Sequence, residues 1–284
     1  MRRLSVRGAT LAFGVIALLL GMWAAWLEPA SLRTDDVALN LPLRSSRALR
    51  VAVLTDLHVG SPFNGLRKLR AVVDRSNAAN PDIVCILGDL VIKGVIGGSF
   101  VPPETIAAEL GRLRAPAGIV AVLGNHDGWF DHDRVVRALD AHGVRVIEDT
   151  AVRLDTGAGP VWAAGLSDLW TGRHDIDAAL ARVPADGTPV LLLTHNPDVF
   201  PMVPARVTLT LAGHTHGGQV RLPLFGPPIV PSRFGRRFAS GHVVEGGRHL
   251  YVATGVGTSI LPVRFLVPPA VTILNLGNDV RSQR

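Results

Sequence analysis

Residues 50–58 have the sequence Arg-Val-Ala-Val-Leu-Thr-Asp-Leu-His, an apolar run that ends in two polar side chains. An apolar run followed by Asp, Asn or His occurs four more times along the chain. The five polar segments are Asp56-Leu57-His58, Gly88-Asp89, Gly124-Asn125-His126-Asp127, His195-Asn196 and Gly213-His214-Thr215-His216. Short apolar runs bounded in this way are typical of buried β-strands. Because ligand sites of α/β sheets gather at the carboxyl ends of strands, we expect the five segments to form one cluster.

The cluster has the composition of a metal site. Together the segments offer two Asp, one Asn and four His, with one further His left over. This set suits two divalent cations, and two cations about 3.5–4 Å apart are a common device for phosphate-ester hydrolysis. Nitrogen and oxygen ligands without a thiolate favour Mn, Fe or Zn over Ca. The residues therefore predict a metal-dependent phosphoesterase.

The remaining pattern predicts an α/β fold. Helical spacing of apolar residues, or a capping residue, marks helices over 66–77, 103–113, 131–142 and 175–183. Strands are expected over 50–55, 83–87, 119–123, 144–147, 151–154, 161–164, 190–193 and 207–211, with strands and turns from 220 to 276. Strand and helix alternate in the first half and strands dominate the second, which favours two packed β-sheets with helices outside. We assign this domain to residues 48–278.

The N-terminal residues predict a membrane segment. Thr10–Leu27 are apolar and uncharged, long enough for a helix to cross a hydrocarbon core of about 30 Å. Arg2, Arg3 and Arg7 precede this run, which favours a cytoplasmic N-terminus and a catalytic domain on the extracytoplasmic side. We expect residues 1–30 to be an uncleaved, single-pass anchor. The alternative is a signal peptide cut near Ala24-Ala25 or Pro29-Ala30-Ser31. Residues 31–47 are expected to be a polar linker.

The composition of the chain indicates which kinds of binding partner to expect. The 284-residue chain has a formal net charge of +6, which favours anionic partners such as phosphates or acidic lipid headgroups, and no nucleic acid is expected as a partner. Cys85 is the single cysteine, so no intramolecular disulfide can form.

The five motifs, in this order, resemble those of the calcineurin-like metallophosphoesterase superfamily, and within it the bacterial membrane-associated phosphodiesterases of the YkuE/YaeI type. Two further stretches, Gly217-Gly218-Gln219 and Gly255-Val256-Gly257-Thr258-Ser259, resemble the same subgroup. The resemblance implies a four-layer sandwich of two mixed β-sheets flanked by helices.

The resemblance also implies a role for each ligand. One ion would be held by Asp56, His58 and His216, the second by Asn125, His195 and His214, and Asp89 would bridge the two. The glycines Gly213, Gly217 and Gly218 would let the backbone turn beside the last two histidines. The implied reaction is in-line attack on phosphorus by a hydroxide that bridges the two ions.

The catalytic candidates are His126 and Asp127. The resemblance implies that His126 protonates the leaving-group oxygen or stabilises the phosphoryl oxygens, since its ordinary pKa lies near neutrality. Asp127 either joins the reaction or orients the loop. Many relatives carry an Asp three residues after the bridging Asp, where it orients the catalytic His, but this chain has Ile92. Another group must orient His126, or its basicity differs.

The expected activity is that of a phosphodiesterase, with a lipid-linked phosphate ester as one candidate substrate. The alternatives are a phosphomonoesterase or nucleotide pyrophosphatase acting on soluble substrates, and a non-catalytic metal-binding scaffold. The apolar stretch Val95–Pro103 either meets a lipid or packs in the ordinary way. Arg233, Arg236 and Arg237 either bind a distal phosphate or form a solvated loop, and His132 is a weaker candidate for substrate contact.

Overall fold

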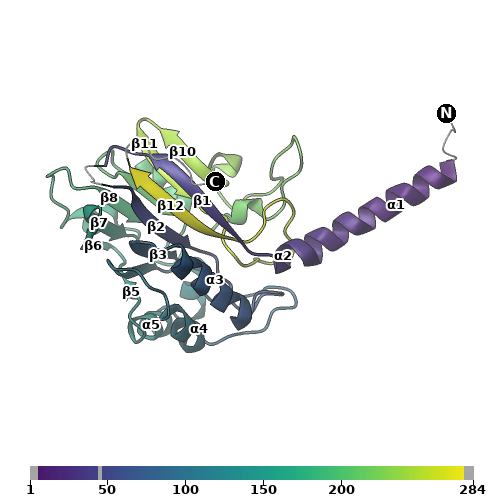
Figure 1. Ribbon diagram of the computed structural model, residues 1–284, viewed down its shortest axis with the longest axis horizontal. Helices are drawn as coiled ribbons and strands as arrows, with labels where there is room; N and C mark the ends of the chain where they lie inside the picture. The colour runs from purple at the N-terminus through teal and green to yellow at the C-terminus, as the bar shows by residue number, and fades with distance from the viewer. Residues whose placement is uncertain (1–5, 44–46, 278–284) are drawn as a thin grey trace.

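The computed structural model describes residues 6–43 and 47–277, which form two six-stranded β-sheets with one long helix projecting from them (Figure 1). The first sheet contains, in spatial order, β1 (Arg33–Asn40), β12 (Ala270–Gly277), β2 (Leu49–Leu54), β3 (Ile83–Leu87), β4 (Ile119–Val122) and β5 (Arg145–Val146). The second contains β10 (Gly241–Glu245), β11 (Arg248–Val252), β9 (Leu209–Ala212), β8 (Val190–Leu193), β7 (Gly159–Gly165) and β6 (Thr150–Thr156). Both sheets mix parallel and antiparallel pairs. The predicted α/β fold of two packed mixed sheets is confirmed.

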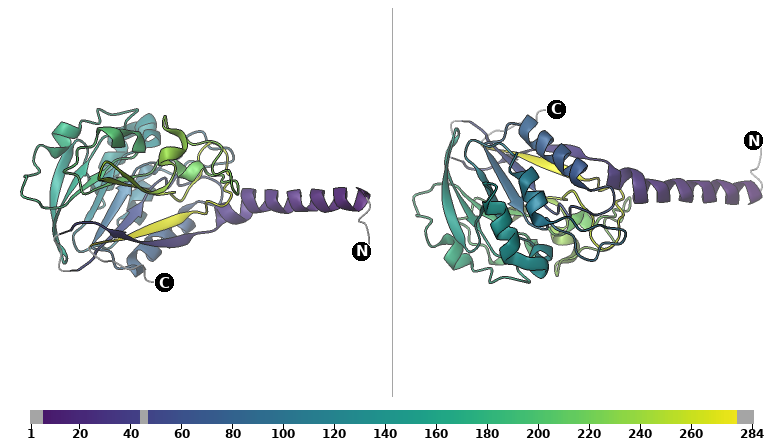
Figure 2. Two further views of the ribbon diagram at one scale, coloured as in Figure 1. Left: turned by 90° about the horizontal axis from the view of Figure 1, so that it is seen from above. Right: turned by 90° about the horizontal axis from the view of Figure 1, so that it is seen from below.

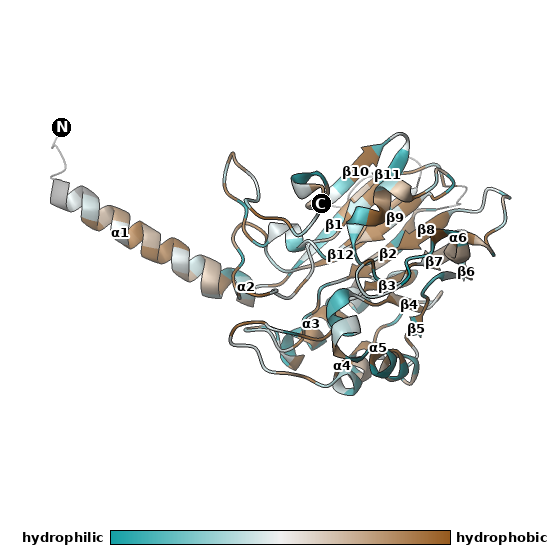
Figure 3. Ribbon diagram, turned by 180° about the vertical axis from the view of Figure 1, so that it is seen from behind, coloured by the Kyte–Doolittle hydropathy of each residue, from teal (hydrophilic) through white to brown (hydrophobic). Residues whose placement is uncertain are grey.

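Helices cover the outer face of each sheet (Figure 2). The first sheet is covered by α3 (Leu66–Ala78), α4 (Pro103–Leu110) and α5 (Asn125–Asp140). The second is covered by α6 (Ile176–Leu180) and by the short 3-10 helices η2 (Pro197–Met202) and η4 (Gly235–Phe238). A further 3-10 turn, η3 (His216–Gly218), follows β9. Figure 3 shows that apolar residues concentrate on the strands and on the projecting helix.

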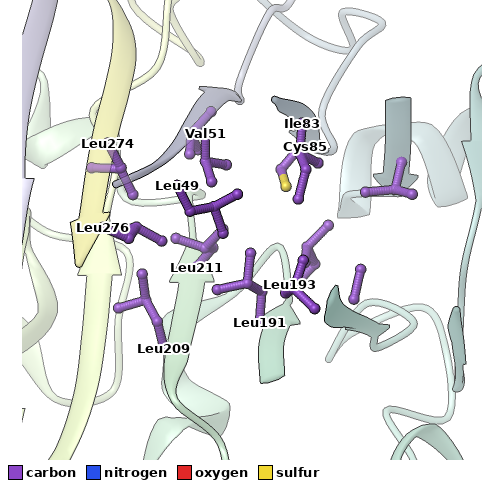
Figure 4. Close-up of a cluster of buried hydrophobic side chains, with 14 of the residues drawn as sticks. Leu49, Val51, Ile83, Cys85, Leu191, Leu193, Leu209, Leu211, Leu274 and Leu276 are labelled. Atoms are coloured by element: carbon purple, nitrogen blue, oxygen red, sulfur yellow. The ribbon is translucent and has the colours of Figure 1, made fainter. Parts of the chain in front are cut away.

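The core lies between the sheets because the strands alternate in burial direction. Val51 and Val53 of β2 point into the layer between the sheets, whereas Ala52 and Leu54 point outward against the helices. This period of two is the geometry of a β-strand. Leucines of both sheets meet in this layer (Figure 4). Burial of these side chains is the main force that holds the two sheets face to face.

Helix α5 contains a break at the predicted capping residue. Asp131 has an extended backbone, with φ −170° and ψ 89°, inside a segment that is otherwise helical. Its carboxylate accepts a hydrogen bond from the Arg134 backbone N–H at 3.1 Å. Asp131 therefore caps the helix that was predicted to start there, and a preceding turn adds the segment from Asn125.

The linker predicted over residues 31–47 is wrong for Arg33–Asn40. These residues form β1, which pairs in parallel with β12 along its whole length. Leu39 and the following Leu41 and Leu43 are buried against the core. Asp35 and Asp36 concealed this strand in the sequence; in the structure Asp35 pairs with Arg33, and Asp36 pairs with Arg50 of β2. Residues 44–46 lie outside the described part of the chain.

The projecting rod consists of α1 (Val6–Met22), a π-helical turn η1 (Trp23–Leu27) and α2 (Glu28–Ala30). Within the described residues, Thr10–Ala30 form the one helical segment long and apolar enough to cross a membrane. By length and composition it suits a membrane span or a signal sequence equally well.

The base of this rod is bonded to the sandwich. The buried Glu28 carboxylate accepts hydrogen bonds from the backbone N–H groups of Leu266 and Val267, at 2.9 and 2.6 Å. The Arg264 backbone N–H donates to the Ala24 carbonyl at 2.9 Å. Lys68 Nζ donates to the Pro29 carbonyl at 2.5 Å. The helix therefore continues directly into the domain, without a flexible segment between them.

The topology places the metal motifs at this same end. β1 begins at Arg33, directly after α2, and runs parallel to β12. β12 is antiparallel to β2, and β2, β3 and β4 are mutually parallel. The carboxyl ends of β2, β3 and β4 therefore lie beside the base of the projecting helix.

Glu28→Ala should lower the free energy of unfolding by about 2–4 kcal/mol, because one buried and one partly buried backbone N–H group lose their acceptor. Urea unfolding of the purified protein in detergent micelles, followed by tryptophan fluorescence, measures this change. Glu104→Ala is the control, since its carboxylate makes a surface ion pair with Arg134. Equal losses in the two variants would contradict the anchoring role of Glu28.

Candidate metal centre

The structure brings all seven predicted ligands together. They come from the loops that follow β2, β3, β4, β8 and β9, and all seven are buried. They are Asp56, His58, Asp89, Asn125, His195, His214 and His216.

The first group is formed by Asp56, His58 and His216. The Nε2 atoms of the two histidines lie 3.2 Å apart. His216 Nε2 lies 3.3 Å from Asp56 Oδ1. The two rings are stacked, with centroids 5.0 Å apart. Three potential ligand atoms thus converge on one point.

The second group is formed by Asp89, His195 and His214, and Asn125 lines the same cavity as Asp89 and His214. His214 Nδ1 lies 3.1 Å from His195 Nε2, and His195 Nε2 lies 3.3 Å from Asp89 Oδ2. These three side chains again bring one ligand atom each to a common point.

Asp89 connects the two groups. Its Oδ2 atom is 3.4 Å from His58 Nε2 in the first group and 3.3 Å from His195 Nε2 in the second. Its other oxygen, Oδ1, accepts a hydrogen bond from the His126 backbone N–H at 2.8 Å. One carboxylate therefore reaches both points, as a ligand that bridges two cations must.

These separations fit metal ions. Two ligand atoms that each lie about 2.1 Å from one ion are about 3–3.4 Å apart. The nitrogen and oxygen pairs of both groups lie between 3.1 and 3.4 Å apart. Asp56 Oδ1 and Asn125 Oδ1 are buried with no hydrogen-bond partner among the described residues. Buried polar atoms are almost always paired, so their lone pairs indicate places for cations.

Burial sets the charge state of the imidazoles. It lowers the pKa of His58 and of His214 to about 3, and the pKa of His216 to well below its usual value. These three rings are therefore neutral, which is the form of histidine that binds metal. Burial also raises the pKa of the Asp56 carboxyl to about 6. A nearby cation would oppose that rise.

His195 is the exception. Burial acts to lower its pKa, but the adjacent Asp89 carboxylate outweighs burial and raises the pKa to about 10. Burial likewise acts to raise the pKa of Asp89, and His195 instead holds it well below its usual range. Without metal, the pair therefore consists of an ionised Asp89 carboxylate and a protonated His195 imidazole. A divalent ion would take the place of the proton, since metal binding to imidazole releases it.

Neighbouring groups orient these ligands. His195 Nδ1 lies 2.7 Å from the Leu87 carbonyl of the opposite sheet, which leaves Nε2 free to face Asp89. Asp56 Oδ2 accepts hydrogen bonds from the His214 backbone N–H and the Thr55 hydroxyl, both at 3.0 Å. One oxygen of Asp56 is therefore fixed and the other remains open.

The backbone is strained at the cluster. Five of the seven candidate ligands have a positive φ: Asp56, His58, Asp89, His214 and His216. Residues other than glycine rarely adopt this conformation, and such strain gathers at functional sites. Gly217 and Gly218 also have positive φ, as predicted for the turn. Gly213 is required for a different reason, because a Cβ there would overlap the Thr55 hydroxyl.

His126 lies beside both groups. Its ring makes an edge contact with His58, with centroids 4.6 Å apart, and a tilted contact with Trp129 at 5.3 Å. Its Nδ1 atom has no hydrogen-bond partner among the described residues, and burial lowers its pKa. Packing between two rings, together with the backbone bond to Asp89, holds His126 in place.

Asp127 has the orienting position rather than a reactive one. Its Oδ1 atom accepts from the backbone N–H groups of Leu90 and Val91, at 2.9 and 3.2 Å. Its Oδ2 atom accepts from the Gly124 backbone N–H at 3.1 Å. Burial raises its pKa to about 7. Both oxygens are therefore engaged in joining the loop after β3 to the loop after β4.

A cavity of about 420 Å³ opens over the cluster. Its floor includes Asp89, Asn125, His126, His214 and His216, and its walls include Lys93, Trp129, Trp170, Ile229 and Ile260. Trp129 and Trp170 are stacked with centroids 6.0 Å apart, and Trp170 makes an edge contact with His214 at 4.6 Å. The two tryptophans were not predicted from the sequence, because each stands alone in a loop or helix without a motif.

Arg264 is a second feature of the site that the sequence motifs do not indicate. Its side chain is fully buried, and its guanidinium donates to the carbonyls of Gly257, Val267 and Thr254. Its Nη2 atom lies 3.5 Å from His216 Nδ1. An arginine inside the apolar run 261–267 was the available signal, since a buried charge needs specific partners.

The weaker candidates for substrate contact, His132, Arg233 and Arg237, do not line the cavity over the metal cluster. His132 pairs with Glu148 and Asp133 and does not line the cavity. Arg237 pairs with Glu245, and Arg233 lies 3.7 Å from Asp198.

Comparison with known proteins agrees with this geometry. The family model of the calcineurin-like phosphoesterases matches residues 49–218. The metallophosphoesterase YkuE of Bacillus subtilis is 30% identical over 89% of this chain and 88% of its own length. The phosphodiesterase YaeI of Escherichia coli is 31% identical over 80% of this chain and 82% of its own. A transmembrane protein with a metallophosphoesterase domain from Danio rerio is 30% identical over 94% of this chain and 62% of its own length.

Asp89→Asn should reduce the bound metal from about two equivalents to less than one, because both groups lose their shared charged ligand. Metal content is measured by mass spectrometry after dialysis. Asp82→Asn is the matched control, since Asp82 is a buried carboxylate at the opposite end of β3. Two full equivalents in the Asp89 variant would exclude the bridging role.

Proposed function

Because the chain belongs to the calcineurin-like phosphoesterase family and is a metal-dependent phosphoesterase, we propose that it is a membrane-anchored phosphodiesterase with a dinuclear centre. The proposed ligands are Asp56, His58 and His216 for one ion, Asn125, His195 and His214 for the other, and Asp89 for both. The observation that carries this proposal is the position of Asp89 Oδ2, within 3.4 Å of a histidine nitrogen in each group. The ligand set suits Mn, Fe or Zn.

The bound ions would polarise the phosphoryl oxygens and supply a nucleophilic water near neutral pH. The chain's own residues supply the rest of the chemistry. His126 lies at the floor of the cavity, 4.6 Å from the His58 ring, where it would donate a proton to the leaving oxygen. Asp127 and Asp89 hold the backbone of this loop and so fix the position of His126.

We assign a lipid-linked ester as the substrate class. Four apolar side chains, Trp129, Trp170, Ile229 and Ile260, form the cavity walls, which suits a substrate with an apolar portion. Glu28 is bonded into the domain, which supports an uncleaved helix as the anchor. Arg2, Arg3 and Arg7 before that helix favour an extracytoplasmic catalytic domain.

One observation favours the alternative of a soluble nucleotide substrate. The exposed faces of Trp129 and Trp170 at the cavity mouth could stack on a base. A nucleotide pyrophosphatase or phosphomonoesterase would use the same centre. The non-catalytic scaffold is disfavoured, since no ligand of either group is missing.

A substrate panel tests the proposal. The purified protein is stripped of metal, reloaded with Mn, Fe or Zn separately, and offered a monoester, a diester, a dinucleotide pyrophosphate and a lipid-linked diester. We expect turnover only with metal, and the highest kcat/KM for the lipid-linked diester. Preference for the pyrophosphate would favour the nucleotide alternative, and no turnover with any ion would reject the proposal.

His126→Ala should retain both metal equivalents and lower kcat by about 10²–10⁴-fold, the usual contribution of acid–base catalysis. Steady-state turnover and metal content are measured on the same preparation. His142→Ala, an exposed histidine directly after the same helix, is the control. Near-normal turnover without His126 would exclude it as the acid.

A further inference from the structure

The cavity and the apolar helix lie at the same end of the sandwich. The carboxyl ends of β2, β3 and β4, which carry the metal ligands, adjoin the start of β1 and therefore α2. Figures 1 and 3 show the loops around residues 92–100 and 220–230 projecting on either side of the base of α1. A membrane crossed by α1 would face these loops.

The domain cannot turn freely about this helix. Glu28 bonds to the backbone of Leu266 and Val267, and Ala24 accepts from Arg264. Because Arg264 also lies against His216, one residue contacts both the helix and the metal cluster. The cavity therefore keeps one orientation relative to the helix axis.

Apolar side chains are exposed around this end of the domain. We define the apolar collar as Ile96, Leu224, Phe225, Ile229, Ile260 and Leu261, which are between 52% and 102% exposed. The Ile96 backbone N–H donates to the Ile260 carbonyl at 3.0 Å, which ties two of the collar loops together. Ile229 and Ile260 also line the cavity over the metal cluster. The collar is thus continuous with the cavity mouth.

Positive charge accompanies the collar. Arg221 and Arg236 line a second cavity of about 500 Å³ together with Leu224, Phe225 and Leu266. Among the described residues, neither guanidinium makes a hydrogen bond or ion pair. Apolar side chains next to unpaired arginines are the composition that binds the interface of an anionic bilayer.

We infer that the apolar collar inserts into the interfacial layer of the membrane that α1 crosses, so that the cavity opens at the lipid headgroups and receives its phosphate ester from the bilayer. This rests on the proposed function, because it requires α1 to be a membrane anchor. The occupant of the collar is the lipid of that same membrane. Lipid matches both the apolar side chains of the collar and the arginines beside them.

Depth-dependent quenching tests the insertion directly. The full chain carrying Leu224→Cys is labelled with a fluorophore and reconstituted in vesicles of phosphatidylcholine and phosphatidylglycerol that contain nitroxide lipids. Cys85 is buried and should not react. The control is Ala185→Cys, since residue 185 lies in the exposed loop before β8, at the end opposite to the cavity. We expect strong quenching at position 224 by shallow nitroxides and none at 185.

A kinetic comparison tests the route of the substrate. Leu224→Asp should lower the ratio of turnover on a bilayer-embedded ester to turnover on a soluble diester by about tenfold, because the membrane then loses the burial of one exposed leucine side chain. Val244→Asp is the matched control, because Val244 is an exposed apolar residue near the carboxyl end of β10, away from the cavity. We expect the control to keep the ratio of the unaltered protein.

The outcomes separate the two proposals. Equal quenching at positions 224 and 185, or equal ratios for Leu224→Asp and Val244→Asp, would overturn insertion of the collar while leaving hydrolysis of the soluble diester intact. Absence of turnover on both esters in the unaltered protein would reject the proposed function instead. The quenching result remains interpretable in either case, because it requires no catalysis.

Discussion

The function of this structure depends on one constraint: the fold holds the ligand nitrogens and oxygens of several loops within 3.4 Å of one another. Asp89 Oδ2 and the Nε2 atoms of His58 and His195 converge from three loops, and the two imidazoles of the first group face each other at 3.2 Å. Neutral nitrogens at this distance repel unless a proton or a cation lies between them. Two rigid sheets, packed through their leucine layer, resist that repulsion. The backbone is also strained there, with positive φ at five of the seven candidate ligands.

Much of this arrangement could be predicted from the sequence, because the strands that carry the ligands are short, apolar and followed by polar residues. Strands over 83–87 and 190–193 match β3 and β8 without change of boundaries. The edge strand β1 could not be predicted in the same way. Its partner β12 lies more than 200 residues later, and pairing across that distance leaves no local signal where Asp35 and Asp36 interrupt the apolar pattern.

In the site, too, some residues could be predicted from the sequence and others could not. Motif residues were predictable because metal binding demands particular ligand atoms at particular spacings. The groups that position them were not, because packing can be supplied by many residue types. The ring of His126, for example, is held between His58 and Trp129. Asp127, for which the motif leaves a reactive and an orienting role open, accepts hydrogen bonds from two backbone N–H groups of the loop after β3 and one of its own loop. Three-dimensional contacts distinguish these roles, and adjacency in the sequence does not.

The bonds between α2 and the sandwich give the proposed membrane anchoring a further consequence. A flexible tether would raise the local concentration of substrate, but it would not fix the direction from which the substrate reaches the cavity. Here Glu28 and Arg264 fix the helix to the segment that also contacts His216, so attachment and orientation arise from the same bonds. If the apolar collar inserts as we propose, the cavity opens at the headgroup layer, where the phosphate of a lipid lies. Substrate selection would then follow from geometry at the membrane, with the metal chemistry common to many phosphate esters.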